Sequence, residues 1–162
     1  MRRVMRGRDD RPSRLQWSAK LPLDPDVDAT AYDRAHHPRV IALVFAGGCA
    51  GGLIRYVVGQ HWSHPASGFP WATFVVNVVG ALVLGVVVEL ATEVLDGSRY
   101  LRPLMGTGFC GALTTFSAIV VDVDRLAAHG HTGVAVGYLL ATVAAGLSAG
   151  ALGLFVTRAV TR

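Results

Sequence analysis

The sequence of 162 residues contains little charge and little cysteine. Asp, Glu, Lys and Arg together make up 16% of the chain, and more than half of them lie within the first 38 residues. The two cysteines, Cys49 and Cys110, lie in apolar segments without the spacing of metal ligands, so we interpret them as small buried hydrophobic residues. The sequence also lacks a nucleophile–base set, a phosphate-binding loop and metal-spaced ligands, and we therefore expect no enzyme.

Apolar residues are abundant instead. Hydrophobic residues make up 52% of the chain and the mean hydropathy is +0.44, values that indicate a small membrane protein. The formal net charge of +4 is compatible with nucleic-acid binding. However, the positive residues gather in the N-terminal tail and near the ends of apolar segments, where lipid head groups explain them better. We therefore expect membrane lipid, and no nucleic acid, as a partner.

The sequence changes character at about residue 38. Residues 1–38 mix Arg with Asp and Pro, which predicts a disordered basic tail. The first apolar run begins only at Val40, so we expect no signal peptide. Residues 39–162 form an all-α membrane domain with four transmembrane helices, predicted at 40–58, 71–90, 104–121 and 133–156. The first span has 19 residues, which as a helix extend about 28 Å and match the hydrocarbon thickness of a bilayer.

The third predicted span has the least regular composition. It carries three glycines and then a hydroxyl cluster: Gly106, Gly108, Gly111, Thr114, Thr115 and Ser117. We predict that this helix breaks at mid-membrane. Each unsatisfied backbone group in hydrocarbon costs several kcal/mol, so the break must be capped, and residues 111–117 are interpreted as an ion or substrate site. A glycine-rich packing face with locally bonded hydroxyls is the alternative.

Polar residues in the other spans each have a functional and a structural interpretation. Asn77 either joins helices or donates to a passing anion. Arg55 either extends to the membrane surface or holds an anion or a partner carbonyl. Tyr138 and Thr142 share one face and either line a pore or serve as an interface aromatic and a locally bonded hydroxyl. Glu89, near a helix end, is expected to be solvated, like Glu93.

The distribution of positive residues predicts the orientation. Of the 15 Lys and Arg residues, nine lie in 1–39, two in the turn 96–102 and two at the C-terminus. Four spans place these three regions on the same side. The positive-inside rule therefore puts both termini in the cytoplasm of a multi-pass protein of the inner (plasma) membrane.

Taken together, these residues resemble the Fluc/CrcB family of small bacterial fluoride channels over roughly residues 40–157. Three ordered motifs carry the resemblance: Gly47-Gly48 through Gly51-Gly52-Leu-Ile-Arg55-Tyr56, then Val76-Asn77-Val-Val-Gly80, and Gly108-Phe-Cys-Gly111-Ala-Leu-Thr114-Thr115-Phe116-Ser117. The resemblance implies an antiparallel dimer that lets fluoride leave the cytoplasm. It also implies a structural sodium ion at the dimer interface, held by the backbone carbonyls of Gly111 and Thr114.

The resemblance further assigns pore roles to Asn77, Arg55, Phe116 and the Tyr138/Thr142 face. Fluoride is small and strongly hydrated, so a pore must replace its water with other donors. The Asn77 amide, hydroxyls such as those of Thr115 and Ser117, and the electropositive ring edge of Phe116 are expected to do so. No pump is needed, because a negative-inside potential drives an anion outward by about 2.3 kcal/mol per 100 mV.

Two positions depart from the family pattern. Ile119 replaces the second pore phenylalanine, and Ala112 replaces the second glycine before the Thr pair. An antiparallel homodimer needs a weak Lys/Arg bias, whereas this chain is strongly biased. It is therefore either a homodimer or one half of a heterodimer with an oppositely oriented paralogue, and a non-conducting partner subunit is a further alternative. A small four-helix multidrug exporter is a second class, but it needs a membrane-embedded carboxylate, and Glu89 is near a helix end.

Overall fold

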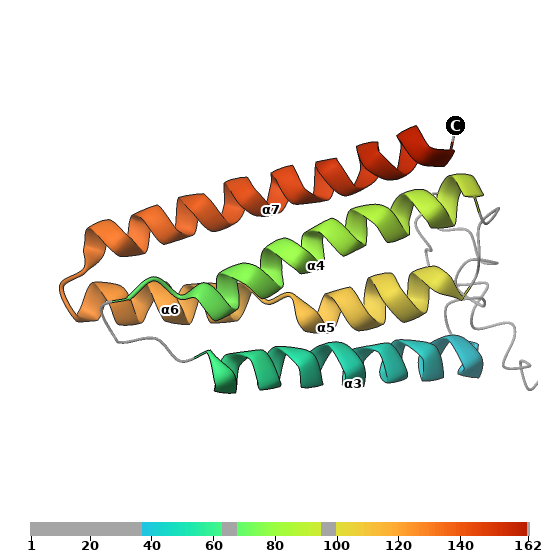
Figure 1. The fold of residues 1–162 in the computed structure, drawn as a ribbon. Helices are drawn as coiled ribbons and strands as arrows, with labels where there is room; N and C mark the ends of the chain where they lie inside the picture. The colour runs from blue at the N-terminus through green and yellow to red at the C-terminus, as the bar shows by residue number, and fades with distance from the viewer. Residues whose placement is uncertain (1–36, 63–67, 95–99, 162) are drawn as a thin grey trace, which may run out of the picture. The chain divides into compact units, whose positions relative to one another are not determined.

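The computed structural model describes residues 37–62, 68–94 and 100–161, and in these ranges all regular structure is helical (Figure 1). The predictions for the N-terminal tail up to residue 36 lie outside these residues. The elements in order are α3 (Pro38–His61), α4 (Trp71–Glu89), η1 (Leu90–Val94), η2 (Arg102–Cys110), α5 (Gly111–Leu113), α6 (Phe116–Ala128) and α7 (Thr132–Thr161).

Four helical segments are long and apolar enough to cross a membrane. They are Pro38–His61, Trp71–Thr92, Arg102–Ala128 and Thr132–Thr161. Large apolar side chains lie outward, for example Phe45 and Leu147, which are each 72% exposed in the single chain. Such exposure is typical of surfaces that face lipid or a second chain, because hydrocarbon does not penalise it. The prediction of an all-α protein with four spans is confirmed.

Local sequence signals explain where several helices begin and end. Pro38 lies in the first turn of α3, where its missing N–H costs nothing, and the Nδ1 atom of the preceding His37 accepts from the Arg39 N–H at 3.3 Å. At the other end of the molecule, Gly130 adopts φ +82° between α6 and α7. A residue with a Cβ rarely adopts this conformation, and it lets the His131 N–H turn back to the Leu126 carbonyl at 2.8 Å.

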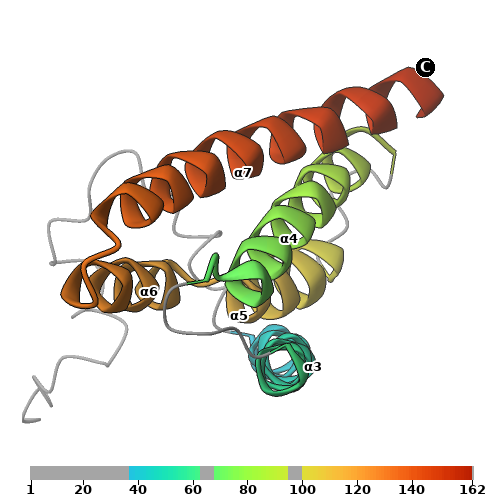
Figure 2. The same ribbon diagram turned by 60° about the vertical axis from the view of Figure 1, so that its left-hand side comes forward.

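The helices pack in two closely apposed pairs, α4 beside α7 and η2 beside α3 (Figures 1 and 2). Between α4 and α7, a Cβ on Gly85 would collide with the carbonyl oxygen of Gly150, and one on Gly153 with that of Leu82. Glycine therefore lets the two backbones approach to direct contact, as small residues commonly do between transmembrane helices.

The pair formed by α3 and η2 has an unusual register. Residues Arg102–Cys110 are wound as a π-helix. On α3, Gly47 and Gly51 are four residues apart, and they lie against the carbonyls of Leu104 and Phe109, which are five residues apart. The wider turn of the π-helix, with its i→i+5 hydrogen bonds, keeps these two carbonyls aligned with glycines spaced for an α-helix. Composition alone does not distinguish this winding from an α-helix.

The third span is longer than its sequence suggested. We expected it to end near Val121, before Asp122, but α6 continues to Ala128 and Asp122 is only 8% exposed. The carboxylate is accommodated because Thr73 Oγ1 donates to its Oδ2 atom at 2.7 Å and the Tyr138 hydroxyl donates at 3.4 Å. Burial of a polar group is tolerated when it is hydrogen-bonded.

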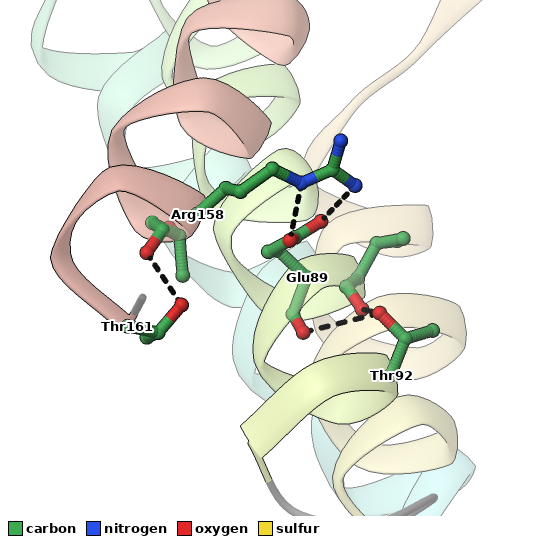
Figure 3. A network of polar contacts seen from close by, with 6 residues as sticks. Glu89, Thr92, Arg158 and Thr161 are labelled. Carbon is green, nitrogen blue, oxygen red and sulfur yellow. Dashed lines mark hydrogen bonds and ion pairs between the residues drawn. The ribbon is translucent and has the colours of Figure 1, made fainter.

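The expectation that Glu89 is solvated is wrong. Glu89 is 2% exposed at the end of α4, and two nitrogens of Arg158 from α7 donate to its carboxylate (Figure 3). Nε lies 2.8 Å from Oε1, and Nη2 lies 3.1 Å from Oε2. The charge is buried because a planar guanidinium from a neighbouring helix supplies a bidentate partner. The side chain of Glu93 lies outside the described residues.

Candidate functional site

The chain leaves the helical conformation between α5 and α6. Thr114 has φ −80° and ψ 151°, and Thr115 has φ −154° and ψ 121°, so both are extended. The side chain of Thr114 fits here because residue 80 on α4 is a glycine. A Cβ on Gly80 would collide with the Thr114 methyl group. The glycine that follows Asn77 by three residues therefore makes room for the interruption.

Asn77 on α4 binds directly to this extended segment. Its Oδ1 atom accepts from the Thr115 N–H at 2.9 Å, while its Nδ2 atom donates to the Thr73 carbonyl at 2.8 Å. These two bonds fix the orientation of the amide. An amide has two N–H donors, and the second one makes no hydrogen bond to any residue that the structure describes.

Thr115 caps the start of α6 with its own side chain. Its Oγ1 atom accepts from the Ala118 N–H at 3.2 Å and shares a hydrogen bond of 3.0 Å with Ser117 Oγ. This is the usual N-cap arrangement, in which a hydroxyl replaces a missing carbonyl acceptor. The hydroxyls of Thr115 and Ser117 are thus brought together with the Asn77 amide in one network.

The capping leaves two backbone carbonyls without their helical donors. In a continuous α-helix the N–H of Thr115 would bond to Gly111 and that of Ala118 to Thr114. Here both N–H groups are bonded to side chains instead. Gly111 is exposed on the surface of the single chain and Thr114 is half-buried. Carbonyl oxygens with free lone pairs suit a hard cation, whereas the neighbouring N–H and hydroxyl groups suit an anion.

A second polar cluster connects with the first through Thr73. The backbone carbonyl of Thr73 accepts from the Asn77 amide, and the Thr73 hydroxyl donates to the Asp122 carboxylate. The same carboxylate also accepts from the Tyr138 hydroxyl. Sequence analysis did not identify Asp122 as part of a site. The signal was available in the helical period, because Asp122 follows Ile119 by three residues and precedes Leu126 by four, and both of these are buried.

The remaining predicted residues lie in varied surroundings. Tyr138 is fully buried, and Thr142 is 3% exposed and donates to the Tyr138 carbonyl at 2.7 Å. Phe116 begins α6 and is 69% exposed. Arg55 on α3 is partly exposed and makes no hydrogen bond or ion pair within the described part of the chain. The structure therefore joins Tyr138 to the Asn77 network through Asp122 and Thr73, but not Arg55.

Ile119, the position expected to carry a second phenylalanine, belongs to the core. It is 5% exposed and packs in a cluster with Leu126, Ala135 and Tyr138. Phe116, three residues earlier, points outward from the same helix. The two positions therefore do not form equivalent parts of one exposed surface in the single chain. No group of three or more His, Cys, Asp or Glu side chains among the described residues is arranged to hold a metal ion.

Comparison with known proteins identifies relatives. The sequence model of the family described as "CrcB-like protein, Camphor Resistance (CrcB)" matches residues 42–154. A protein of Mycolicibacterium paratuberculosis named "Fluoride-specific ion channel FluC 1" is 46% identical over 114 residues, which are 70% of this chain and 86% of that protein. A "FluC 2" of Streptomyces avermitilis is 45% identical over 104 residues, 64% of this chain and 66% of that one. A "FluC 1" of Streptomyces coelicolor is 38% identical over 151 residues, 93% and 87% of the two chains.

Proposed function

This chain belongs to the CrcB-like family, and from that membership we propose that it is a fluoride-specific ion channel, not an enzyme, which passively releases fluoride from the cytoplasm and so lowers its toxicity. The observation in the structure that supports this most directly is the fixed amide of Asn77. Its oxygen is tied to the Thr115 N–H and one of its N–H groups to the Thr73 carbonyl, so the second N–H donor is held in a set direction.

An oriented donor is what a small hydrated anion requires. Fluoride gives up its water only where fixed donors replace it, and an amide that need not reorient does so without further cost. The hydroxyls of Thr115 and Ser117 lie next in the same network, and the exposed ring of Phe116 lies between these two residues in the chain. Its positive edge is a further contact for an anion. Tyr138 and Thr142 on α7, and Arg55 on α3, are proposed to line the remainder of the path.

The carbonyls of Gly111 and Thr114 are proposed to hold a structural sodium ion at the interruption of the third span, at mid-membrane depth. These residues fit a hard cation, because both oxygens have lost their helical donors. Two oxygens do not complete its shell, since hard cations take about six oxygen ligands or more. An antiparallel second copy would supply the same pair by two-fold symmetry, since an isologous interface presents identical residues from both chains.

The second chain is proposed to be either another copy or an oppositely oriented paralogue. Of the 15 Lys and Arg residues, 13 fall in the tail, the turn 96–102 and the C-terminus, and by the positive-inside rule we propose that both termini lie in the cytoplasm and the protein in the inner (plasma) membrane. A chain with this bias inserts in one orientation, which favours a paralogue as the antiparallel partner. Two of the relatives, named FluC 2 and FluC 3, both belong to Streptomyces avermitilis, which accords with several such chains in one organism.

The experiment that tests the function is fluoride efflux from liposomes containing the purified chain, alone and with a paralogue from the same genome. Asn77→Ala should abolish efflux in whichever preparation conducts. Gln60→Ala is the matched control, because it also removes an amide but one whose Nε2 atom only donates to Tyr56 at the exposed end of α3. Efflux from the chain alone would establish a homodimer. Absence of fluoride efflux in both preparations would refute the proposal that this chain is a conducting subunit.

A drug exporter, the other class considered, would need a carboxylate that exchanges protons. Glu89 is buried, but Arg158 binds both of its carboxylate oxygens, so the carboxylate is engaged in a bidentate ion pair. Transport of a cationic dye that is lost in Glu89→Gln and kept in Asn77→Ala would favour the exporter.

A further inference from the structure

Two side chains at the interruption act as substitutes for backbone carbonyls. Asn77 Oδ1 accepts a hydrogen bond from the N–H of Thr115 at 2.9 Å, and Thr115 Oγ1 accepts one from the N–H of Ala118 at 3.2 Å. Each of these N–H groups would otherwise return to a carbonyl one turn earlier, at Gly111 and Thr114 respectively. The side chains therefore determine which carbonyls of this segment stay available.

We propose that Asn77 has two separable tasks, one for each end of its amide: the N–H end serves the anion, and the oxygen end keeps the Gly111 carbonyl available for the cation. Thr115 performs the second task for the Thr114 carbonyl through its hydroxyl. Both residues are in this sense positioning residues of the cation site, without touching the cation themselves. The inference rests on the proposed function, because it assumes the sodium ion at these carbonyls.

The physical reason is the demand of a buried N–H for an acceptor. Thr115 is 9% exposed, so its N–H has little access to water. If Asn77 Oδ1 were absent, the acceptor offered by helical geometry is the Gly111 carbonyl, and α5 would extend through Thr114 toward α6. That rewinding would use the lone pair that the cation needs. Loss of the Asn77 amide oxygen would thus weaken cation binding, because the Thr115 N–H would then occupy the Gly111 carbonyl.

Two pairs of variants separate acceptor from donor. Asn77→Asp keeps an oxygen in the place of Oδ1 but has no N–H to offer, whereas Asn77→Ala removes both. Thr115→Ser keeps the hydroxyl, whereas the isosteric Thr115→Val removes it. The second pair keeps the test decisive if an Asn77 variant fails to fold. In each pair only the first variant retains the substitute acceptor.

The measurement is the thermal unfolding midpoint of the purified full chain, or of its heterodimer, at increasing Na⁺ with N-methylglucamine balancing the ionic strength. A cation that binds only the folded state raises the midpoint with its concentration. Thr115→Ser should keep the native Na⁺ dependence, and Asn77→Asp should keep more of it than Asn77→Ala, although its second oxygen can no longer donate to the Thr73 carbonyl. Asn77→Ala and Thr115→Val should need about tenfold more Na⁺ for the same rise, equivalent to ~1.4 kcal/mol. Fluoride efflux, measured in parallel, should be lost in both Asn77 variants.

Three outcomes would overturn the inference, and they differ in what else they overturn. If Na⁺ does not stabilise the native protein, the sodium ion fails together with the inference, while fluoride efflux still tests the channel. If Na⁺ stabilises the native protein, and Asn77→Ala and Thr115→Val show the same Na⁺ dependence as the native protein, the inference alone fails. If Thr115→Ser loses the response as fully as Thr115→Val, the hydroxyl is not the group responsible.

Discussion

The ion pair between Glu89 and Arg158 offers the sharpest test of how the helices are held together. Arg158→Gln would remove a guanidinium whose Nε and Nη2 atoms lie 2.8 Å and 3.1 Å from the two carboxylate oxygens. The side chain of Glu89 is 3% exposed and that of Arg158 is 45% exposed. The substitution therefore deprives a buried charge of its bidentate partner while changing little apolar surface.

These exposures set the expected magnitude. Removing one partner of a fully buried pair costs about 3–5 kcal/mol, whereas exposed pairs contribute only about 0.2–1 kcal/mol. Because water reaches about half of Arg158, we expect a loss of roughly 2 kcal/mol, between these limits. At roughly 2–4 °C per kcal/mol, the unfolding midpoint should fall by about 4–8 °C.

A double-mutant cycle measures this loss, using thermal unfolding of the purified protein in detergent. Arg158→Gln leaves a buried carboxylate without its guanidinium, so it should be more harmful than Glu89→Gln, which leaves a neutral amide. The double variant should recover part of the loss, because it buries no charge. Arg158→Lys should fall between, since an ammonium cannot make both bonds at once. Strict additivity of the two single variants would refute the reasoning.

Other changes test the packing and the buried polar groups. Gly85→Ala should lower the unfolding midpoint markedly, because its methyl group would meet a backbone carbonyl of α7, whereas Gly137→Ala, with nothing within 4 Å, should not. Ile119→Phe should cost about 1–3 kcal/mol of stability through overpacking, and an unchanged midpoint would contradict the buried position. Asp122→Leu should cost about 1–3 kcal/mol by removing the acceptor of the Thr73 hydroxyl, with Asp122→Asn milder in the same unfolding assay.

Most of the fold was predictable because a transmembrane helix is a local property. Each span needs only enough consecutive apolar residues to cross hydrocarbon, and its length follows from the rise of the helix. The predicted 40–58 and 71–90 accordingly fall inside Pro38–His61 and Trp71–Thr92. The third span was predicted too short, ending before Asp122, because an acidic residue usually marks the aqueous end of a span. The groups that bind Asp122 in the interior, Thr73 and Tyr138, are distant in the sequence.

The candidate site was predictable in its residue types but not in its bonds. The glycines and hydroxyls of residues 104–121 indicated an irregular segment, and Asn77 was recognised as a polar residue that needs partners. The partner of its oxygen, the Thr115 N–H, lies 38 residues away in the chain. The assignment of pore residues stays a prediction.

The sequence by itself determined the class of this protein, its four apolar spans and its family, because these depend on composition, local hydrophobicity and ordered motifs. Only the tertiary structure decided which polar groups are satisfied and which are left available. Thr73 meets Asp122 across 49 residues and Glu89 meets Arg158 across 69. The physical reason is that a buried polar group is stable only with a partner of suitable geometry, and in a helical membrane protein that partner comes from a different helix.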